Sequence, residues 1–230
     1  MSNLHLLLWL EAPLQSWGVD SKFSRRDTLN FPTKSGVLGL LCCALGAAGE
    51  QCELLARLAS LNQCVLSFIR ESAESELLLR DFHMVGSGYD PQDKWQNLLV
   101  PKTSEGTKAV GGGTKMTYRY YLQDTYFAVV LTVPDDMGKT LANALQNPVW
   151  DLYLGRKNCV PTDFIYRGLY DFESDALDQA LNIAHEKELV ENFRVLDGEH
   201  NGEVLILNDV PLQFGTSKRY RDRRVTVISS

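Results

Sequence analysis

The chain has 230 residues, of which 44% are hydrophobic, and a formal net charge of −6 at pH 7. These values are typical of a globular protein with a packed core, and the net charge argues weakly against a nucleic-acid binder. No apolar run approaches the roughly twenty residues of a membrane span, and residues 4–10 lack the basic flank and cleavage site of a signal peptide, so we expect a cytoplasmic protein with no membrane partner.

The first two predicted elements are a strand and a helix. Residues 4–10 form a near-continuous apolar run, which predicts a central strand buried on both faces. A long polar connection follows, and Pro32 with the capping side chains Thr33 and Ser35 then marks a helix start. Apolar residues recur at helical spacing over residues 37–48, which gives this helix one buried face.

The later elements alternate between strands and helices. In chain order they are a helical segment over residues 50–61, strands over 65–69 and 77–85, an irregular segment over 86–114, strands over 116–122 and 126–133, helices over 135–146 and 174–188, and strands over 193–196, 204–207 and 225–228. Gln123 and Asp124 predict a turn between two of these strands. The strands on either side of the irregular segment can be the two legs of a protruding hairpin.

This order of elements predicts the fold class α+β, with a ferredoxin-like βαββαβ body over residues 1–150. An inserted hairpin covers about residues 77–122, and a β-rich C-terminal extension covers residues 151–230. Bodies of this kind include the RNA-recognition fold, so local basic patches are informative despite the negative net charge.

Metal and cofactor sites are not predicted. The five cysteines form no CxxC pair and are odd in number, and the four histidines form no HxxxH or HExxH arrangement. Reduced cysteines in the core are the better interpretation.

The start of the first helix is the main candidate for binding an anion. Lys34, Ser35 and Gly36 could contact phosphates or base edges through a side chain and exposed backbone N–H groups. Arg25 and Arg26 precede the helix and could stack on bases or bind phosphates. The alternative is an ordinary capped helix with solvated cations.

Further candidates lie in three later segments, each with a structural alternative. The irregular segment could cross an RNA with its lysines and glycines, or it could be a loose surface loop. Residues 156 and 157 form a compact basic turn, which could contact RNA or be solvated. Arginines near the end of the chain could form a phosphate-binding row or protect an edge strand. The residues are Lys102, Lys108, Gly111, Gly112, Lys115, Arg156, Lys157, Arg219 and Arg221.

Four motifs in order resemble the CasD family, the RAMP-type subunit of the Cascade surveillance complex of CRISPR systems. They are LLWLEAPLQSWG at residues 7–18, FPTKSGVLGLL at 31–41, YLGRKNCVP at 153–161, and DVP at 209–211 followed by RYRDRR at 219–224. The resemblance covers nearly the whole chain.

The resemblance implies a ferredoxin-like palm with a β-hairpin thumb that grips the 5′ handle of a CRISPR RNA. It implies CasC-type backbone subunits and the large subunit that reads the protospacer-adjacent motif as partners, with target DNA contacted through the complex. In this lineage the subunit is a structural clamp without catalytic residues or cofactors.

Two alternatives remain open. In a sister lineage the equivalent subunit is a metal-independent endoribonuclease that processes repeat RNA, and His83 is the histidine best placed near an RNA path. The other alternative is a ferredoxin-like scaffold protein that does not bind RNA.

Overall fold

The structure, a computed structural model, describes residues 3–18, 24–71, 78–85, 90, 92–95, 102–107 and 115–229. The strands are β1 (Asn3–Gln15), β2 (Arg25–Arg26), β3 (Gln63–Arg70), β4 (Leu79–Val85), β5 (Lys115–Pro134), β6 (Tyr166–Tyr170), β7 (Leu189–Asp197), β8 (Glu203–Gln213) and β9 (Arg219–Ser229). The helices are α1 (Lys34–Leu45), α2 (Cys52–Leu58), α4 (Asp135–Gln146) and α5 (Glu173–Glu186).

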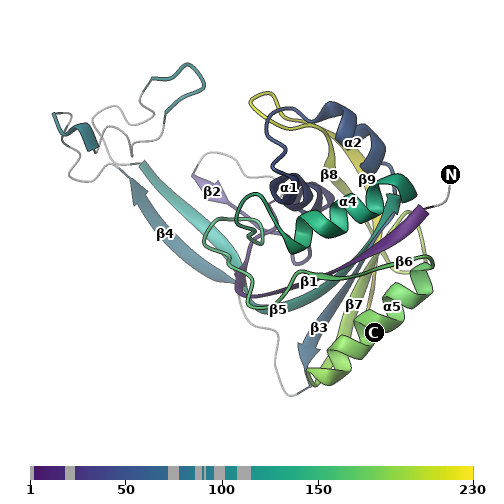
Figure 1. The fold of residues 1–230 in the computed structure, drawn as a ribbon. Coiled ribbons are helices and arrows are strands. Elements are labelled where there is room, and N and C mark those ends of the chain that lie inside the picture. Colours follow the sequence, from purple (N-terminus) through teal and green to yellow (C-terminus); the bar gives the residue numbers. More distant parts are fainter. Residues whose placement is uncertain are drawn as a thin grey trace.

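One large sheet organises the chain into a mixed α/β architecture (Figure 1). Its strand order is β6-β1-β5-β3-β7-β9-β8, and neighbouring strands along this path are antiparallel. The short β2 and the hairpin strand β4 both pair with β5. Because β7 pairs directly with β3, the C-terminal strands continue the same sheet as the N-terminal ones.

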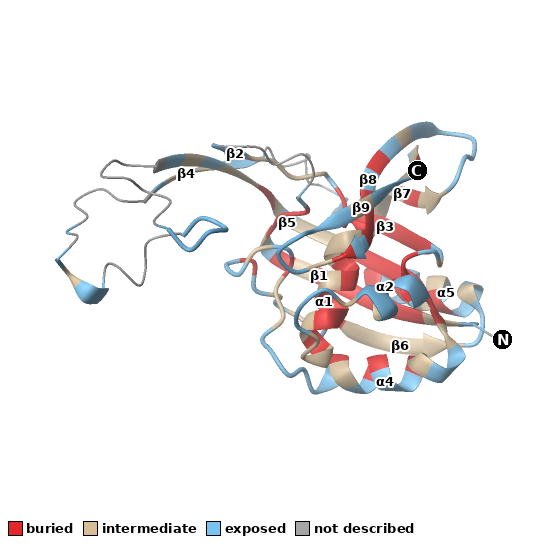
Figure 2. Ribbon diagram, turned by 90° about the horizontal axis from the view of Figure 1, so that it is seen from above, coloured by how far each residue is buried: buried red, intermediate tan, exposed pale blue. Residues whose placement is uncertain are grey.

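The two faces of the sheet are each covered by helices, and β1 contributes side chains to both. Leu6, Leu8 and Leu10 lie in a core cluster with residues of α1, α2 and α4. Leu7 and Trp9 point to the other face and pack with residues of α5. This alternation confirms the prediction of a strand buried on both faces. The burial colours in Figure 2 show the same central band of buried strands.

Helix α5 packs closely on its face of the sheet because it presents small side chains there. Ala176, Ala180 and Ala184 are all buried in the second core cluster. The part of this sheet face formed by β1, β5 and β3 is therefore covered by protein.

Strand β5 is twenty residues long and joins the body to a projecting hairpin. Its C-terminal half lies between β1 and β3, whereas its N-terminal half pairs with β4 from Leu79↔Tyr121 to Val85↔Lys115. Figure 1 shows this hairpin standing away from the body. The predicted turn at Gln123 and Asp124 is wrong, since the strand passes through both residues with Asp124 at φ 42°.

Other element boundaries also differ from the prediction. The first helix ends at Leu45 instead of residue 48, because Gly46 adopts the left-handed conformation of a helix C-cap. The edge strand β6 was not predicted. Its sequence YRGLY contains Gly168, and its pairing with β1 is interrupted between Leu7 and Leu8, so its apolar pattern is short and irregular.

Candidate nucleic-acid interface

The side chain of Lys34 is buried inside the chain. It is 2% exposed, and its ammonium donates hydrogen bonds to the Leu61 carbonyl at 2.5 Å and to Asp197 Oδ2 at 2.9 Å. Burial lowers the pKa of Lys34, and the charge of Asp197 opposes that shift. The prediction that this side chain contacts RNA is therefore corrected, because its ammonium already has two internal partners.

Lys34 belongs to a buried cluster that also contains Asp197, Asp209 and Arg223. The Arg223 guanidinium donates to both oxygens of Asp209 at 2.7 and 2.8 Å, and it also binds Asp197. Asp209 Oδ2 accepts from the backbone N–H of Lys34 at 2.7 Å. Two cations and two carboxylates thus connect the start of α1 to β7, β8 and β9.

The start of α1 is capped by a side chain, as predicted. Thr33 Oγ1 accepts hydrogen bonds from the Gly36 N–H at 3.2 Å and from Ser35 Oγ at 3.4 Å. A Cβ at Gly36 would lie 2.8 and 2.9 Å from ring atoms of Trp17. The glycine at this position therefore permits close packing of Trp17 on the helix.

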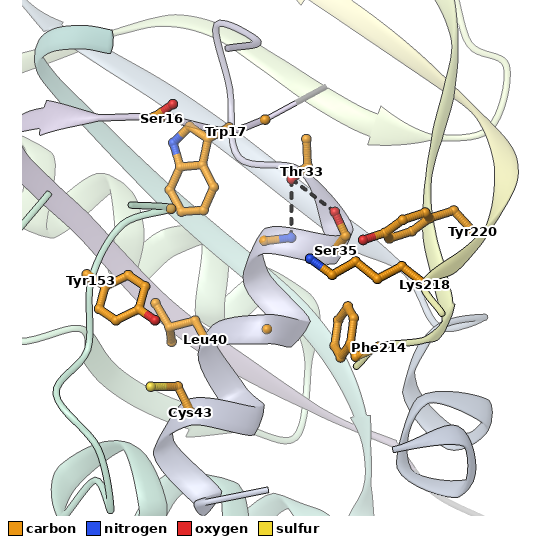
Figure 3. Close-up of a pocket in the computed structure, with 14 residues that line it drawn as sticks. Ser16, Trp17, Thr33, Ser35, Leu40, Cys43, Tyr153, Phe214, Lys218 and Tyr220 are labelled. Atoms are coloured by element: carbon orange, nitrogen blue, oxygen red, sulfur yellow. Dashed lines mark hydrogen bonds between the residues drawn. The ribbon is translucent and has the colours of Figure 1, made fainter. Parts of the chain in front are cut away.

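A hollow of about 370 Å³ lies over this part of α1. Figure 3 shows Trp17 and Tyr153 on one side of the helix and Phe214, Lys218 and Tyr220 on the other. The complete lining is Ser16, Trp17, Gly18, Thr33, Ser35, Gly36, Gly39, Leu40, Cys43, Tyr153, Gly155, Phe214, Lys218 and Tyr220. Ser35 and Gly36 line the hollow, in agreement with their selection as binding candidates, whereas Lys34 does not.

One wall of the hollow is formed where the loop after α4 crosses the end of β1. Gly155 has φ +95°, and a Cβ there would lie 1.7 Å from the Ser16 carbonyl oxygen. The adjacent Leu154 carbonyl accepts a hydrogen bond from the Ser16 N–H at 3.1 Å. The crossing therefore depends on a residue without a side chain.

The guanidinium of Arg156 is used inside the protein. It donates to the backbone carbonyls of Tyr120 at 3.2 Å and Arg26 at 2.9 Å, and it lies 4.6 Å from the centre of the Tyr121 ring. These contacts make it a brace between the loop, β2 and β5, and because it is half-buried and lines the second hollow described below, it stays a candidate for RNA binding. The neighbouring Lys157 is exposed and stays a candidate.

Of the other predicted arginines, Arg25 and Arg219 are exposed and have intramolecular partners. Arg25 bonds to Asp27 at 2.8 and 2.9 Å and lies 4.9 Å from the Tyr120 ring centre, and Arg219 bonds to Gln213 at 2.9 Å. Arg26 follows Arg25 in β2, and Arg221 is exposed on β9. An RNA phosphate would exchange with, or add to, these partners.

The predicted row of arginines on β9 is interrupted by burial. Arg219 and Arg221 are exposed, but Arg223 belongs to the buried ion cluster. A continuous phosphate-binding row through all three is therefore not formed.

The projecting hairpin carries exposed apolar and aromatic side chains on one face. Phe82 is paired with Tyr118, and Met84 with Met116, and each of these four residues is between 42% and 54% exposed. The Phe82 and Tyr118 ring centres are 5.4 Å apart, and Arg80 lies 5.6 Å from the Tyr118 ring centre. One face of the hairpin thus carries an arginine beside aromatic side chains, followed by two methionines.

The opposite face of the hairpin borders a second hollow, of about 600 Å³. His83 and Arg119 from the hairpin line it together with Lys157 from the loop. The Nδ1 atom of His83 is buried and has no hydrogen-bond partner among the described residues. This hollow gathers an imidazole with the three cations Arg119, Arg156 and Lys157, and the carboxylate of Asp81 lines it as well.

The remaining candidates belong to the inserted segment. Lys108, Gly111 and Gly112 lie outside the described residues, and Lys115 begins β5 but its side chain is not described. Lys102 is exposed.

The described part of the chain contains no group of three or more His, Cys, Asp or Glu side chains arranged to hold a metal ion. None of its described helices is long and apolar enough to cross a membrane.

Comparisons with known proteins give a consistent relationship. Residues 5–226 match the family described as CRISPR-associated protein (Cas_Cas5). The chain belongs to this family. It is 30% identical over 171 residues to the CRISPR system Cascade subunit CasD of Escherichia coli (strain K12), with 71% of this chain and 70% of CasD covered.

Two solved structures are also similar. One is a chain of a CRISPR RNA-guided surveillance complex, with a TM-score of 0.72, 27% identity, and coverage of 98% of this chain and 90% of that chain. The other is titled crystal structure of Cas protein, with a TM-score of 0.63, 27% identity, and coverage of 98% and 94%.

The motifs that resemble the Cas_Cas5 family lie together in the structure. The N-terminal motif supplies Trp17 and the loop motif supplies Tyr153 and Gly155, and all three line the hollow over α1. The C-terminal motifs supply Asp209 and Arg223, which hold the start of that helix. The family resemblance is thus concentrated at one place, the N-terminal half of α1 and its supports.

Sequence reasoning missed three residues of this place, Phe214, Lys218 and Tyr220. They lie at and beside the turn between β8 and β9, which the prediction left between two short strands. It also did not select Arg80, Phe82 and Met84 of the hairpin, although their spacing two residues apart was a signal that they share one face of a strand.

Proposed function

We propose that this chain is a non-catalytic RNA-binding subunit of a Cascade-type surveillance complex. Membership in the Cas_Cas5 family and the similarity to a named Cascade subunit support this proposal. The chain would clamp the 5′ handle of a CRISPR RNA in the cytoplasm, cap the filament of CasC-type subunits, adjoin the large PAM-reading subunit and contribute to interference with target DNA.

The arrangement of strands supports a finer assignment of parts. The strand order β6-β1-β5-β3, with α1 and α4 packed in the same core cluster, fits a ferredoxin-like palm. Strand β4 and the paired half of β5 fit the thumb, and residues 151–230 fit a C-terminal extension packed on the palm.

The observation that carries the proposal is the exposed face of the hairpin. Single-stranded RNA is bound without sequence readout by aromatic side chains that stack on bases and by cations that attract the backbone. Phe82, Tyr118 and Arg80 provide both kinds of group on a structure that projects from the body. The apolar rings would otherwise remain in contact with water.

The substitution Tyr118→Ala is expected to weaken RNA binding about tenfold, since one base–aromatic stack contributes about 1–3 kcal/mol. Fluorescence anisotropy with a labelled single-stranded oligouridine at low salt measures the change. Phe172→Ala is the matched control, because Phe172 is an aromatic residue with 68% exposure that does not lie on the hairpin. Equal affinities of the two variants would contradict the proposed hairpin interface.

A second candidate function is metal-independent cleavage of repeat RNA, which the hollow around His83 favours. His83 could take the proton of a ribose 2′-OH while the 2′ oxygen attacks phosphorus and the 5′ oxygen leaves with a proton from an acid. Arg119 and Lys157 line the same hollow and could stabilise the added charge on the phosphate.

Incubation of the chain with labelled repeat RNA and EDTA separates the two functions. The clamp predicts intact RNA with the wild-type chain. A discrete product that disappears with His83→Ala, while binding is retained, would establish the ribonuclease instead.

A further inference from the structure

The hollow over α1 has the lining of a site for a flat, anionic ligand. Its volume of about 370 Å³ falls within the range of about 300–1,000 Å³ that is usual for small-ligand sites. Four aromatic residues line it, namely Trp17, Tyr153, Phe214 and Tyr220. In Figure 3 the rings of Tyr153 and Phe214 lie on opposite sides of the helix, and Gly39 of that helix is also part of the lining.

The floor of the hollow is kept open by Gly39. A Cβ built at this position has no atom of the described residues within 4 Å, and its φ is not in the left-handed region, so neither their packing nor the backbone conformation requires glycine there. Glycine within a helix costs about 1 kcal/mol relative to alanine. Gly36 differs, because Trp17 fills the space beside it. The open space at Gly39 is therefore unexplained by the fold and available to a ligand.

The charge of the hollow suits a phosphate. Among the described residues, Lys218 is the one charged residue in its lining, and Figure 3 shows its ammonium directed toward the first turn of α1, near Ser35. That first turn contains no acidic residue. The partial positive charge of the helix start and the charge of Lys218 thus both attract an anion.

We infer that this hollow holds one unstacked nucleotide of the bound RNA. Its base lies over Gly39 between Tyr153 and Phe214, and its phosphate contacts Lys218 and the Ser35 hydroxyl. This inference rests on the proposed RNA-binding function and adds a second contact to it, separate from the hairpin face. Gly39 and Lys218 become residues that determine which part of the RNA is held.

The test uses the full chain and a single-stranded oligouridine that carries 4-thiouridine. Near-ultraviolet light cross-links the probe, and peptide mapping identifies the residues reached. The wild-type chain is expected to cross-link at Tyr153, Phe214 or Tyr220. Gly39→Phe, which fills the hollow, is expected to remove these cross-links, to weaken binding about tenfold, and to retain cross-links to the hairpin.

Two further variants control for folding and charge. Leu181→Phe places the same aromatic side chain at an exposed helical position outside the hollow and is expected to bind as the wild-type chain does. Lys218→Gln is expected to reduce the slope of log affinity against log salt by about one, as the loss of one phosphate contact does.

The outcomes separate this inference from the proposed function. Cross-links confined to the hairpin in the wild-type chain, with unchanged binding by Gly39→Phe, would overturn the nucleotide site and leave the RNA-binding function intact. Absence of RNA binding by the wild-type chain would overturn both.

Discussion

Replacement of Arg223 by methionine is expected to lower the free energy of unfolding by about 3–5 kcal/mol, the usual effect of removing one partner from a buried ion pair. The guanidinium forms two hydrogen bonds with Asp209 and also binds Asp197. Methionine occupies similar space but leaves the carboxylate of Asp209, which is 3% exposed, without its cation. Desolvation of that uncompensated charge is the physical cause of the loss.

Arg221→Met is the matched control because it makes the same chemical change two residues away on β9, at an exposed position. Its effect is expected to stay within about 0.5 kcal/mol, as for most surface substitutions. Urea denaturation followed by circular dichroism measures both variants. Similar midpoints for the two would show that the cluster does not hold the C-terminal strands to α1.

The first strand and first helix were predictable because their information is local. The apolar run of β1 and the helical spacing of apolar residues in α1 depend only on neighbours in the sequence. The capping of α1 by Thr33 is local as well, since donor and acceptor are three residues apart.

The role of Lys34 could not be predicted, because its partners come from distant strands. Asp197 and Asp209 lie 163 and 175 residues away in the sequence. A lysine beside a helix start has the same local signature whether it is solvated, bound to phosphate or buried in an ion pair. Only the pairing of β7, β8 and β9 brings the two carboxylates to α1.

The turn predicted at Gln123 and Asp124 failed for the opposite reason, since a local signal was overridden by strand pairing. Strand β1 pairs with β5 on both sides of this point, at Ala12↔Thr125 and Leu14↔Gln123. Between them lies Pro13, which has no N–H to donate. Gln123 and Asp124 therefore form a local distortion inside one long strand, and this strand joins the hairpin to the centre of the sheet.

The substitution Gly155→Ala is expected to lower the free energy of unfolding by about 3 kcal/mol or more, an effect comparable to that of Arg223→Met. Alanine at φ +95° is strained by about 1–3 kcal/mol. Its Cβ would in addition lie 1.7 Å from the Ser16 carbonyl oxygen. Rotation of a side chain moves neither this Cβ nor the Ser16 carbonyl oxygen, so the loop must shift away from the end of β1.

Gly18→Ala is the control for this substitution, because Gly18 lines the same hollow and a Cβ there has nothing within 4 Å. Thermal and urea denaturation measure stability, and oligouridine anisotropy measures binding. A shift of the loop would displace Tyr153 and widen the hollow, so Gly155→Ala is expected to weaken RNA binding while Gly18→Ala retains it. Full stability and binding by Gly155→Ala would show that the crossing of this loop over β1 does not shape the hollow.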